Sequence, residues 1–285
     1  MALLKRCKPR QNARFYCLLL AGLAAPAWAQ EPPQDLADLS LEELMKLEVE
    51  TVFGASKYIQ KVTQAPASVT IITSEEIRKY AYRTLADALR TVRGLYATYD
   101  RNYSYLGVRG FNRPGDYNAR ILLLVDGHRA NDNIYDQAAL GTEFPLDVDL
   151  IDRIEVIRGP SSSIYGTNAF FAVVNVITRR GRNLQGAEAS AELASFGTLK
   201  GRISYGAEMK NGLEVLLSGT VYDSHGHDRL YFRDFDSPAT HNGIAENVDD
   251  DQSQQLFLNL SYRDFAVRGV YGSREKGIPT CILRL

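Results

Sequence analysis

The sequence predicts a small α+β domain followed by a region of antiparallel β-strands. Between Ser68 and Thr178, helix-capping patterns alternate with short apolar runs. The stretch 150–178, LIDRIEVIRGPSSSIYGTNAFFAVVNVIT, joins two apolar runs by a loop rich in glycine, proline and serine. After Gly181 the pattern changes to a regular alternation of apolar and polar residues. These three observations predict the fold class.

The first 29 residues have the pattern of a secretory signal peptide. Five basic residues precede an apolar core at 15–25, and Ala27-Trp28-Ala29 forms a small-x-small end. The apolar core is shorter than the ~20 residues that a membrane-spanning helix needs. We therefore expect cleavage after Ala29 and a mature chain that begins at Gln30.

Composition excludes several function classes. The 285 residues are 45% hydrophobic and 24% charged, which is ordinary for a folded protein. Without residues 1–29 the chain has 28 Lys and Arg against 34 Asp and Glu, a formal charge of −6. This charge argues against a nucleic-acid partner. Cys7 and Cys17 leave with the signal peptide, so Cys281 remains alone, and we expect no disulfide within the mature chain.

The segment before the α+β domain is expected to contain a leader, a short helix and a β-prone stretch. Residues 30–33 are a flexible leader, and Ser40-Leu41-Glu42-Glu43 is a capping box that starts a helix through Leu47. Val49 to Ala55 follows as the β-prone stretch. From these residues alone it is an edge strand.

The α+β domain itself begins with a strand at Ser68–Ile72, and its helices start at two caps. Thr73-x-x-Glu76 opens the first helix, and Thr84-x-x-Asp87 opens a second that we expect to stop at Gly94. Further strands are expected at 108–111 and 121–125, with turns at 112–116 and at Asp126-Gly127.

The stretch 150–178 provides two more strands. The first ends at Arg158, because Pro160 cannot donate to a ladder and favours an extended residue before it. Serines 161–163 are expected to form a turn. Val173 to Thr178 is a β-branched run interrupted by Asn175, which is typical of a strand buried on both faces, so the Asn175 side chain must find partners.

This stretch resembles the end of the plug domain of TonB-dependent outer-membrane receptors. The resemblance covers nearly thirty positions, including Gly159, Pro160, Gly166 and the exit strand Asn175-Val-Ile-Thr, and it extends upstream over about 45–180. Ala172 departs from the glycine usual in the family. The resemblance implies four segments: a signal peptide at 1–29, an N-terminal extension at 30–56, the plug at 57–180 and about five barrel strands at 181–285.

The family also implies an energy coupler as partner. At the position of the β-prone stretch, the receptors have a TonB box, which pairs by strand addition with the periplasmic domain of TonB. The corresponding residues here are Glu50, Thr51, Val52, Phe53, Gly54 and Ala55. A simple edge strand is the alternative.

The alternating region is expected to form transmembrane strands. They are placed near 187–196, 199–209, 213–222, 254–262 and 265–273, about the length of a tilted membrane strand. Val215, Leu217 and Val221 are expected to face outward to lipid. Tight turns at 210–212 and 263–264 and a long polar loop at 223–253 match short periplasmic and long outer connections. A soluble sandwich shows the same alternation, and the preceding plug favours the membrane interpretation.

Five strands cannot close a barrel, since at least eight are needed and the family has about 22. We therefore interpret the sequence as the N-terminal part of a truncated receptor in the outer membrane of a Gram-negative bacterium. Its expected function is energised uptake of a scarce ligand such as a siderophore, another metal chelate or cobalamin. A soluble periplasmic binding or signalling module that keeps the plug fold without transport is the alternative.

Ligand contacts are expected on outward-facing plug loops, because aromatic rings with a few polar groups suit a chelate or a ring-rich ligand. The candidates are Tyr103, Tyr105, Arg113, Tyr117, Asn133 and Tyr135. Packing against the barrel wall is the alternative for these tyrosines. Three further residues, Arg109, Glu155 and Arg158, lie in motifs that form plug–barrel ion pairs in the family. An ion pair within the plug is the alternative for them.

The remaining polar clusters favour no chemistry. His225-Gly226-His227-Asp228 has the residue types of a metal site, and Asp249-Asp250-Asp251 those of a calcium site, but both are interpreted as solvated loop. Gly159-Pro160-Ser161 lacks the lysine of a phosphate-binding loop. With no nucleophile, base and orienting group together, we expect neither an enzyme nor a cofactor.

Overall fold

The computed structural model describes residues 51–52, 60–61, 68–113 and 115–282. They belong to one compact unit, Val49–Leu285. The expected signal peptide, the helix from Ser40 and the residues Glu50, Phe53, Gly54 and Ala55 lie outside the described residues. Of the β-prone stretch, Thr51–Val52 (β1) is described, and it pairs antiparallel with Gln60–Lys61 (β2).

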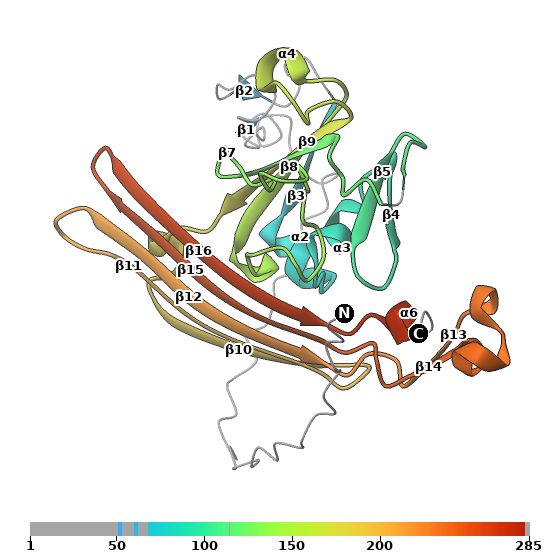
Figure 1. The fold of residues 1–285 in the computed structure, drawn as a ribbon. Helices are drawn as coiled ribbons and strands as arrows, with labels where there is room; N and C mark the ends of the chain where they lie inside the picture. The colour runs from blue at the N-terminus through green and yellow to red at the C-terminus, as the bar shows by residue number, and fades with distance from the viewer. Residues whose placement is uncertain (1–50, 53–59, 62–67, 114, 283–285) are drawn as a thin grey trace, which may run out of the picture. The chain divides into compact units, whose positions relative to one another are not determined.

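A five-stranded mixed sheet forms the centre of the α+β domain (Figure 1). Its strand order is β3-β8-β9-β6-β7, in which β6 and β9 are parallel and all other neighbours antiparallel. The strands are β3 (Ser68–Thr73), β8 (Ile151–Arg158), β9 (Ala172–Thr178), β6 (Ile121–Val125) and β7 (His128–Arg129). The four longer strands were all expected from the sequence.

Asn175 in β9 shows how the sheet buries a polar side chain. The residue is fully buried, its Oδ1 accepts a hydrogen bond from Gly127 N at 3.1 Å, and its Nδ2 donates to Glu155 Oε2 at 3.3 Å. Leaving such an amide unpaired would cost about 1–3 kcal/mol. The prediction that Asn175 must find partners is confirmed.

Both predicted capping boxes are present. Thr73 Oγ1 accepts from Glu76 N at 3.2 Å at the start of α2 (Ser74–Lys79), and Thr84 Oγ1 accepts from Asp87 N at 3.1 Å at the start of α3 (Leu85–Leu89). The helix α3 ends five residues before Gly94, so the predicted stop was placed too late. Gly94 has φ +85° and instead makes the turn into β4.

A two-stranded ribbon, β4 (Leu95–Tyr99) and β5 (Ser104–Val108), stands beside the main sheet. Tyr96 pairs with Gly107, and its ring covers the glycine so closely that a Cβ there would lie 2.2 Å from the ring. The predicted strand at 108–111 was wrong, because the backbone turns at Arg109 and Gly110, both with positive φ. The serines expected to form a turn begin a helical turn, α4 (Ser162–Tyr165).

Five long antiparallel strands form a second sheet, here called the wall sheet, in the order β10-β11-β12-β15-β16 (Figure 1). They are β10 (Gly186–Ala194), β11 (Thr198–Glu208), β12 (Leu213–Ser224), β15 (Asp251–Tyr262) and β16 (Phe265–Lys276). All five predicted strands are present. The last three extend beyond their predicted ends by two to three residues, because their ladders continue into polar sequence that alternation alone does not mark.

The connection between β12 and β15 is not the plain loop that its polar composition suggested. It contains the paired strands β13 (Arg229–Tyr231) and β14 (Ile244–Glu246) and two 3-10 segments, η4 (Arg233–Phe235) and η5 (Pro238–Gly243). Tyr231 Oη donates to Asp236 at 2.8 Å within this excursion. Three short helical segments complete the described chain: η3 (Val148–Leu150), α5 (Gly181–Leu184) and α6 (Pro279–Ile282).

The two faces of the wall sheet differ as alternation predicts. Leu217, Val221 and Leu256 on the outward face are each more than half exposed, whereas their neighbours Leu216, Ser218 and Phe257 are buried. Leu216 and Phe257 join the same hydrophobic cluster as residues of the α+β domain. The inward face of the wall sheet therefore packs on that domain. Among the described helices, none is long and apolar enough to cross a membrane.

Candidate functional site

Three of the six predicted ligand residues form a row of aromatic rings. The centroids of Tyr103 and Tyr117 are 5.7 Å apart, and those of Tyr117 and Tyr135 are 5.5 Å apart. The three tyrosines come from three different loops. Tyr135 is 65% exposed, and the other two are half-buried. We call this set the tyrosine row.

Buried Asn118 holds two of these loops together. Its Oδ1 accepts from Leu106 N at 2.8 Å, and its Nδ2 donates to the carbonyls of Ser104 and Ala138 at 2.9 and 3.0 Å. The Asn118 side chain thereby links the backbone after Tyr103 to the backbone after Tyr135. Tyr117 directly precedes Asn118 in the sequence. Asn118 was not identified from the sequence, because nothing local marks an asparagine whose partners are 12 to 20 residues away.

An aspartate fixes the loop that carries Tyr135. Asp132 Oδ1 accepts from Ile134 N and Tyr135 N at 2.7 and 2.8 Å, and Oδ2 accepts from Gln137 N at 2.8 Å. The hydrogen bond from Tyr135, together with those from Ile134 and Gln137, holds the pKa of Asp132 below its usual value, against the opposing effect of desolvation. Ile134 is 84% exposed as a result. Asn133 also lies exposed in this loop.

The other two predicted ligand residues, Tyr105 and Arg113, are not members of the tyrosine row. Tyr105 is 3% exposed, and its hydroxyl donates to Asp100 at 2.8 Å, so it is a structural residue. Burial, together with this hydrogen bond to a carboxylate, raises the pKa of Tyr105. Arg113 is exposed at the turn before Asp116.

One group of ion pairs between the α+β domain and the wall sheet comes from residues that the sequence did not single out. Lys200 Nζ lies 2.6 Å from Asp147 Oδ1 and 3.1 Å from Asp149 Oδ2. Thr220 Oγ1 donates to Asp147 Oδ2 at 3.0 Å, and Arg202 lies within 4 Å of both carboxylates. The Asp147 side chain is 1% exposed. We call this set the Asp147 cluster.

A second polar contact, the Arg274 cluster, lies where the wall sheet meets the long connection. Arg274 forms a two-pronged pair with Asp251, with distances of 3.1 and 3.0 Å. Thr142 Oγ1 donates to Asp251 Oδ2 at 2.6 Å, and Arg274 Nη1 donates to Asn102 Oδ1 at 3.2 Å. Close by, Asp249 pairs with Arg101 at 3.3 Å and with Lys276 at 2.9 Å. Asp249 and Asp251 are buried and paired, so their interpretation as solvated loop was wrong.

The residues predicted for plug–barrel ion pairs lie elsewhere. Arg158 donates to Arg93 O, Ser68 Oγ and Thr70 Oγ1, all within the α+β domain. Glu155 is fully buried and receives Arg153 Nη2 at 3.0 Å. Arg109 is exposed in the turn after β5. Among the described contacts, the structure brings none of the three to the wall sheet.

Two histidines of the long connection, His225 and His227, lie beside the turn at Phe196 and Gly197. His225 is exposed, and His227 packs its ring on Phe196 with centroids 4.2 Å apart. Within the described residues, no group of three or more His, Cys, Asp or Glu side chains could hold a metal ion.

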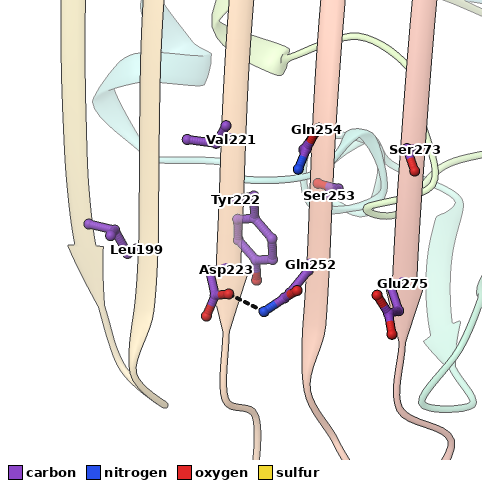
Figure 2. Close-up of a pocket in the computed structure, with 9 residues that line it drawn as sticks. All are labelled: Leu199, Val221, Tyr222, Asp223, Gln252, Ser253, Gln254, Ser273 and Glu275. Atoms are coloured by element: carbon purple, nitrogen blue, oxygen red, sulfur yellow. Dashed lines mark hydrogen bonds between the residues drawn. The ribbon is translucent and has the colours of Figure 1, made fainter. Parts of the chain in front are cut away.

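The outward face of the wall sheet becomes polar toward the long connection. Successive cross-strand rows change from Gly219 and Leu256 with Tyr271, through Val221 and Gln254, to Asp223 and Gln252. A groove of about 250 Å³ lies at this change. Figure 2 shows its lining residues, among them Leu199, Val221 and the hydrogen bond from Gln252 to Asp223. On β12, β15 and β16 the apolar band of the sheet therefore ends at these rows, whereas Leu193 and Leu199 keep the same row apolar on β10 and β11.

Known proteins share sequence with the α+β domain of this chain. Residues 61–173 match the model of the TonB-dependent receptor plug domain. The "Vitamin B12 transporter BtuB" of Vibrio vulnificus is 31% identical over 181 residues, which are 62% of this chain and 28% of the relative. The "Iron-regulated outer membrane virulence protein" of Vibrio cholerae is 33% identical over 143 residues, 49% of this chain and 21% of the relative. The chain thus spans less than a third of the length of either.

Two solved structures share the fold. The ferripyoverdine receptor of the outer membrane of Pseudomonas aeruginosa aligns with a TM-score of 0.61 at 15% identity, over 79% of this chain and 27% of that one. The ferric-catecholate import receptor Fiu of Escherichia coli K12 aligns with a TM-score of 0.52 at 18% identity, over 75% and 28%.

These relatives are outer-membrane transport receptors and not enzymes, which confirms the expected location and the expectation of no enzymatic activity. The family match, the mixed sheet and the antiparallel wall agree with one another. The chain contains a TonB-dependent receptor plug domain at residues 61–173, followed by antiparallel strands of the fold that these receptors have.

Proposed function

We propose that this chain is the N-terminal part of a receptor that takes up a scarce ligand, a metal chelate or cobalamin, across the outer membrane with energy delivered by TonB. The observation that carries the proposal is the tyrosine row. Its rings gather on the plug at an exposed position, and aromatic faces with a few polar groups suit ring-rich ligands.

The row lies on the side from which such a ligand would come. Arg101 and Asn102, next to Tyr103, contact Asp249 and Arg274 at the long-connection end of the wall sheet. In outer-membrane proteins the long connections face outside and the short turns face the periplasm. Tyr103, Tyr117 and Tyr135, with exposed Arg113 and Asn133 nearby in sequence, are the proposed contact residues.

Energy coupling on the periplasmic side would use β1. Thr51 and Val52 adopt strand conformation and pair with β2, which agrees with a segment that can exchange strand partners. We propose that residues 50–55 pair with the periplasmic domain of TonB. The outward face of the wall sheet would meet outer-membrane lipid, because its large exposed side chains are apolar up to the rows at Asp223.

Binding measurements on the chain in detergent test the ligand proposal. Cyanocobalamin, ferripyoverdine and ferric enterobactin are the probes, and equilibrium dialysis measures Kd. We expect one probe to bind, and Tyr117→Ala to weaken it about ten-fold, because the substitution removes both ring contacts of the row, worth roughly 1 kcal/mol or more.

Tyr80→Ala is the matched control. Tyr80 is a plug tyrosine that is 59% exposed and stacked on Tyr82 at 5.7 Å, outside the tyrosine row. It should leave Kd unchanged. Equal weakening of binding by both substitutions would contradict the tyrosine row as the binding site. If no probe bound at millimolar concentration, the proposed ligand classes would be wrong.

A further inference from the structure

We propose that Arg274 is a positioning residue that fixes the loop at 100–103, and with it Tyr103, against the plug segment 140–143. The inference rests on the proposed function, since it concerns how the tyrosine row is held in place. Arg274 lies in β16 and its side chain is 12% exposed, yet its contacts reach two plug segments that are about 40 residues apart in the sequence.

The three nitrogens of the guanidinium serve two partners. Nε and Nη2 donate to the two carboxylate oxygens of Asp251 on the neighbouring strand β15, and Nη1 donates to Asn102 Oδ1 at 3.2 Å. The planar fork of arginine can make all three contacts at once, whereas the single ammonium of lysine cannot keep the same geometry.

The loop that receives Arg274 is a tight turn. Asp100 Oδ1 accepts from Asn102 N at 2.8 Å and from Tyr103 N at 2.7 Å, and Asp100 N donates to Tyr103 O at 3.2 Å. These hydrogen bonds shape the turn and include the Asn102 and Tyr103 amides. Among the described contacts, Asn102 with Arg274 ties the turn to β16, and Arg101 with Asp249 ties it to the connection just before β15.

Arg274 also interacts with the segment 140–143, through Asp251 and through its charge near Glu143. Thr142 Oγ1 donates to Asp251, and Glu143 Oε1 accepts from the amides of Leu140 and Gly141 at 3.1 and 3.0 Å. Glu143 Oε2 is buried, has no hydrogen-bond partner among the described residues, and lies 3.9 Å from Arg274 Nη1. The charge of Arg274 is what compensates this oxygen.

Removing the guanidinium would leave two buried carboxylates, Asp251 and Glu143, without their shared cation. Like charges in a poorly solvated site repel and raise the free energy of the arrangement. We infer that the segment 140–143 and the loop 100–103 would then separate from β16 together, although they are distant in sequence. Tyr103 would lose its fixed place in the tyrosine row.

Hydrogen exchange on the full chain in detergent tests this without any ligand, so its failure is distinct from failure of the proposed function. Arg274→Ala should raise the exchange rates of the Asn102, Tyr103, Leu140 and Gly141 amides about ten-fold or more. Arg268→Ala is the matched control, because Arg268 lies on the same face of β16 and pairs with Asp126 at 3.3 Å. It should leave those four amides unchanged.

Two further variants keep the inference testable if Arg274→Ala does not fold. Asn102→Ala should raise the exchange rate of the Tyr103 amide and leave those of Leu140 and Gly141 unchanged. The substitution removes the hydrogen bond between Asn102 and Arg274 but keeps the charge of Arg274 near Glu143. Arg274→Lys should affect Asn102 and Tyr103 more than Leu140 and Gly141, because the charge near Glu143 remains. Unchanged exchange at Tyr103 in Asn102→Ala, or equal effects of the Arg274 and Arg268 substitutions, would overturn the inference.

Discussion

Lys200 Nζ lies 2.6 Å from Asp147 Oδ1, so the inward face of β11 is bound to the plug by a buried ion pair between residues 53 positions apart. Asp147 is reached in addition by Thr220 from β12 and approached by Arg202 from β11. Two neighbouring strands thus converge on one carboxylate. The plug is held to the wall sheet here by charge and hydrogen bonds, beside the apolar contact of Leu216 and Phe257.

Replacing this carboxylate should loosen the plug. Breaking a buried pair leaves an uncompensated charge, which costs about 3–5 kcal/mol. In Asp147→Ala, Asp149 would remain as the only nearby carboxylate for Lys200 among those described. We expect the free energy of opening at the Leu150 and Arg179 amides, measured by hydrogen exchange, to fall by roughly 3 kcal/mol.

Glu192→Ala is the control for that substitution. Glu192 pairs with Arg83 at 2.6 Å and also links wall sheet to plug, but both side chains are more than a third exposed. Exposed pairs contribute about 0–1 kcal/mol. Similar losses for the two variants would show that the Asp147 cluster has no special part in docking.

Acid should release the loop that presents Tyr135. The folded-state pKa of Asp132 is lowered, so its carboxylate stabilises the loop at neutral pH, and this stabilisation is lost as the pH falls through the lowered value. Methyl NMR of Ile134, two residues away, should therefore report a midpoint below the ordinary aspartate pKa of about 3.9. Asp132→Asn should abolish that transition. A midpoint at or above the ordinary value would contradict the role given to Asp132.

The coupling segment can be tested as a peptide. Residues 45–60 should bind the periplasmic domain of TonB weakly through main-chain pairing, and Val52→Pro should abolish binding because proline cannot donate to a ladder. Ser56→Pro, outside 50–55, should keep it. Titration calorimetry measures both, and equal binding by the Val52 variant would show that no strand is added there.

The plug and the wall sheet should behave differently when separated. Residues 50–180 contain capped helices, a buried mixed sheet and turn glycines that agree with one another, so we expect cooperative unfolding and protected amides in water. Residues 187–285 expose Leu217, Val221, Leu256 and Val267 on one face and have two unpaired edge strands, β10 and β16, in the described sheet. They should precipitate or need detergent. A soluble, monomeric and cooperatively folding 187–285 would contradict the membrane interpretation of these strands.

The sequence alone predicted the elements whose signals are local. The boxes at Thr73 and Thr84 place a side-chain acceptor three residues before the amide it caps, so four letters suffice to recognise them. The run 173–178 and the alternation of 213–222 report burial on two faces or on one, because side chains alternate along a strand. The glycine and proline pattern of 159–166 was specific enough to indicate the family.

Tertiary structure decided the contacts between distant segments. Lys200 and Arg202 lie on a strand that was expected near 199–209, but their charges do not name a partner, and Asp147 lies about fifty residues away. Tyr103, Tyr117 and Tyr135 were candidates together with Tyr105, and only the fold buries Tyr105 while it brings the rings of the other three into contact. Periodicity fixes which face of an element a residue occupies, whereas the meeting of two faces depends on how the whole chain packs.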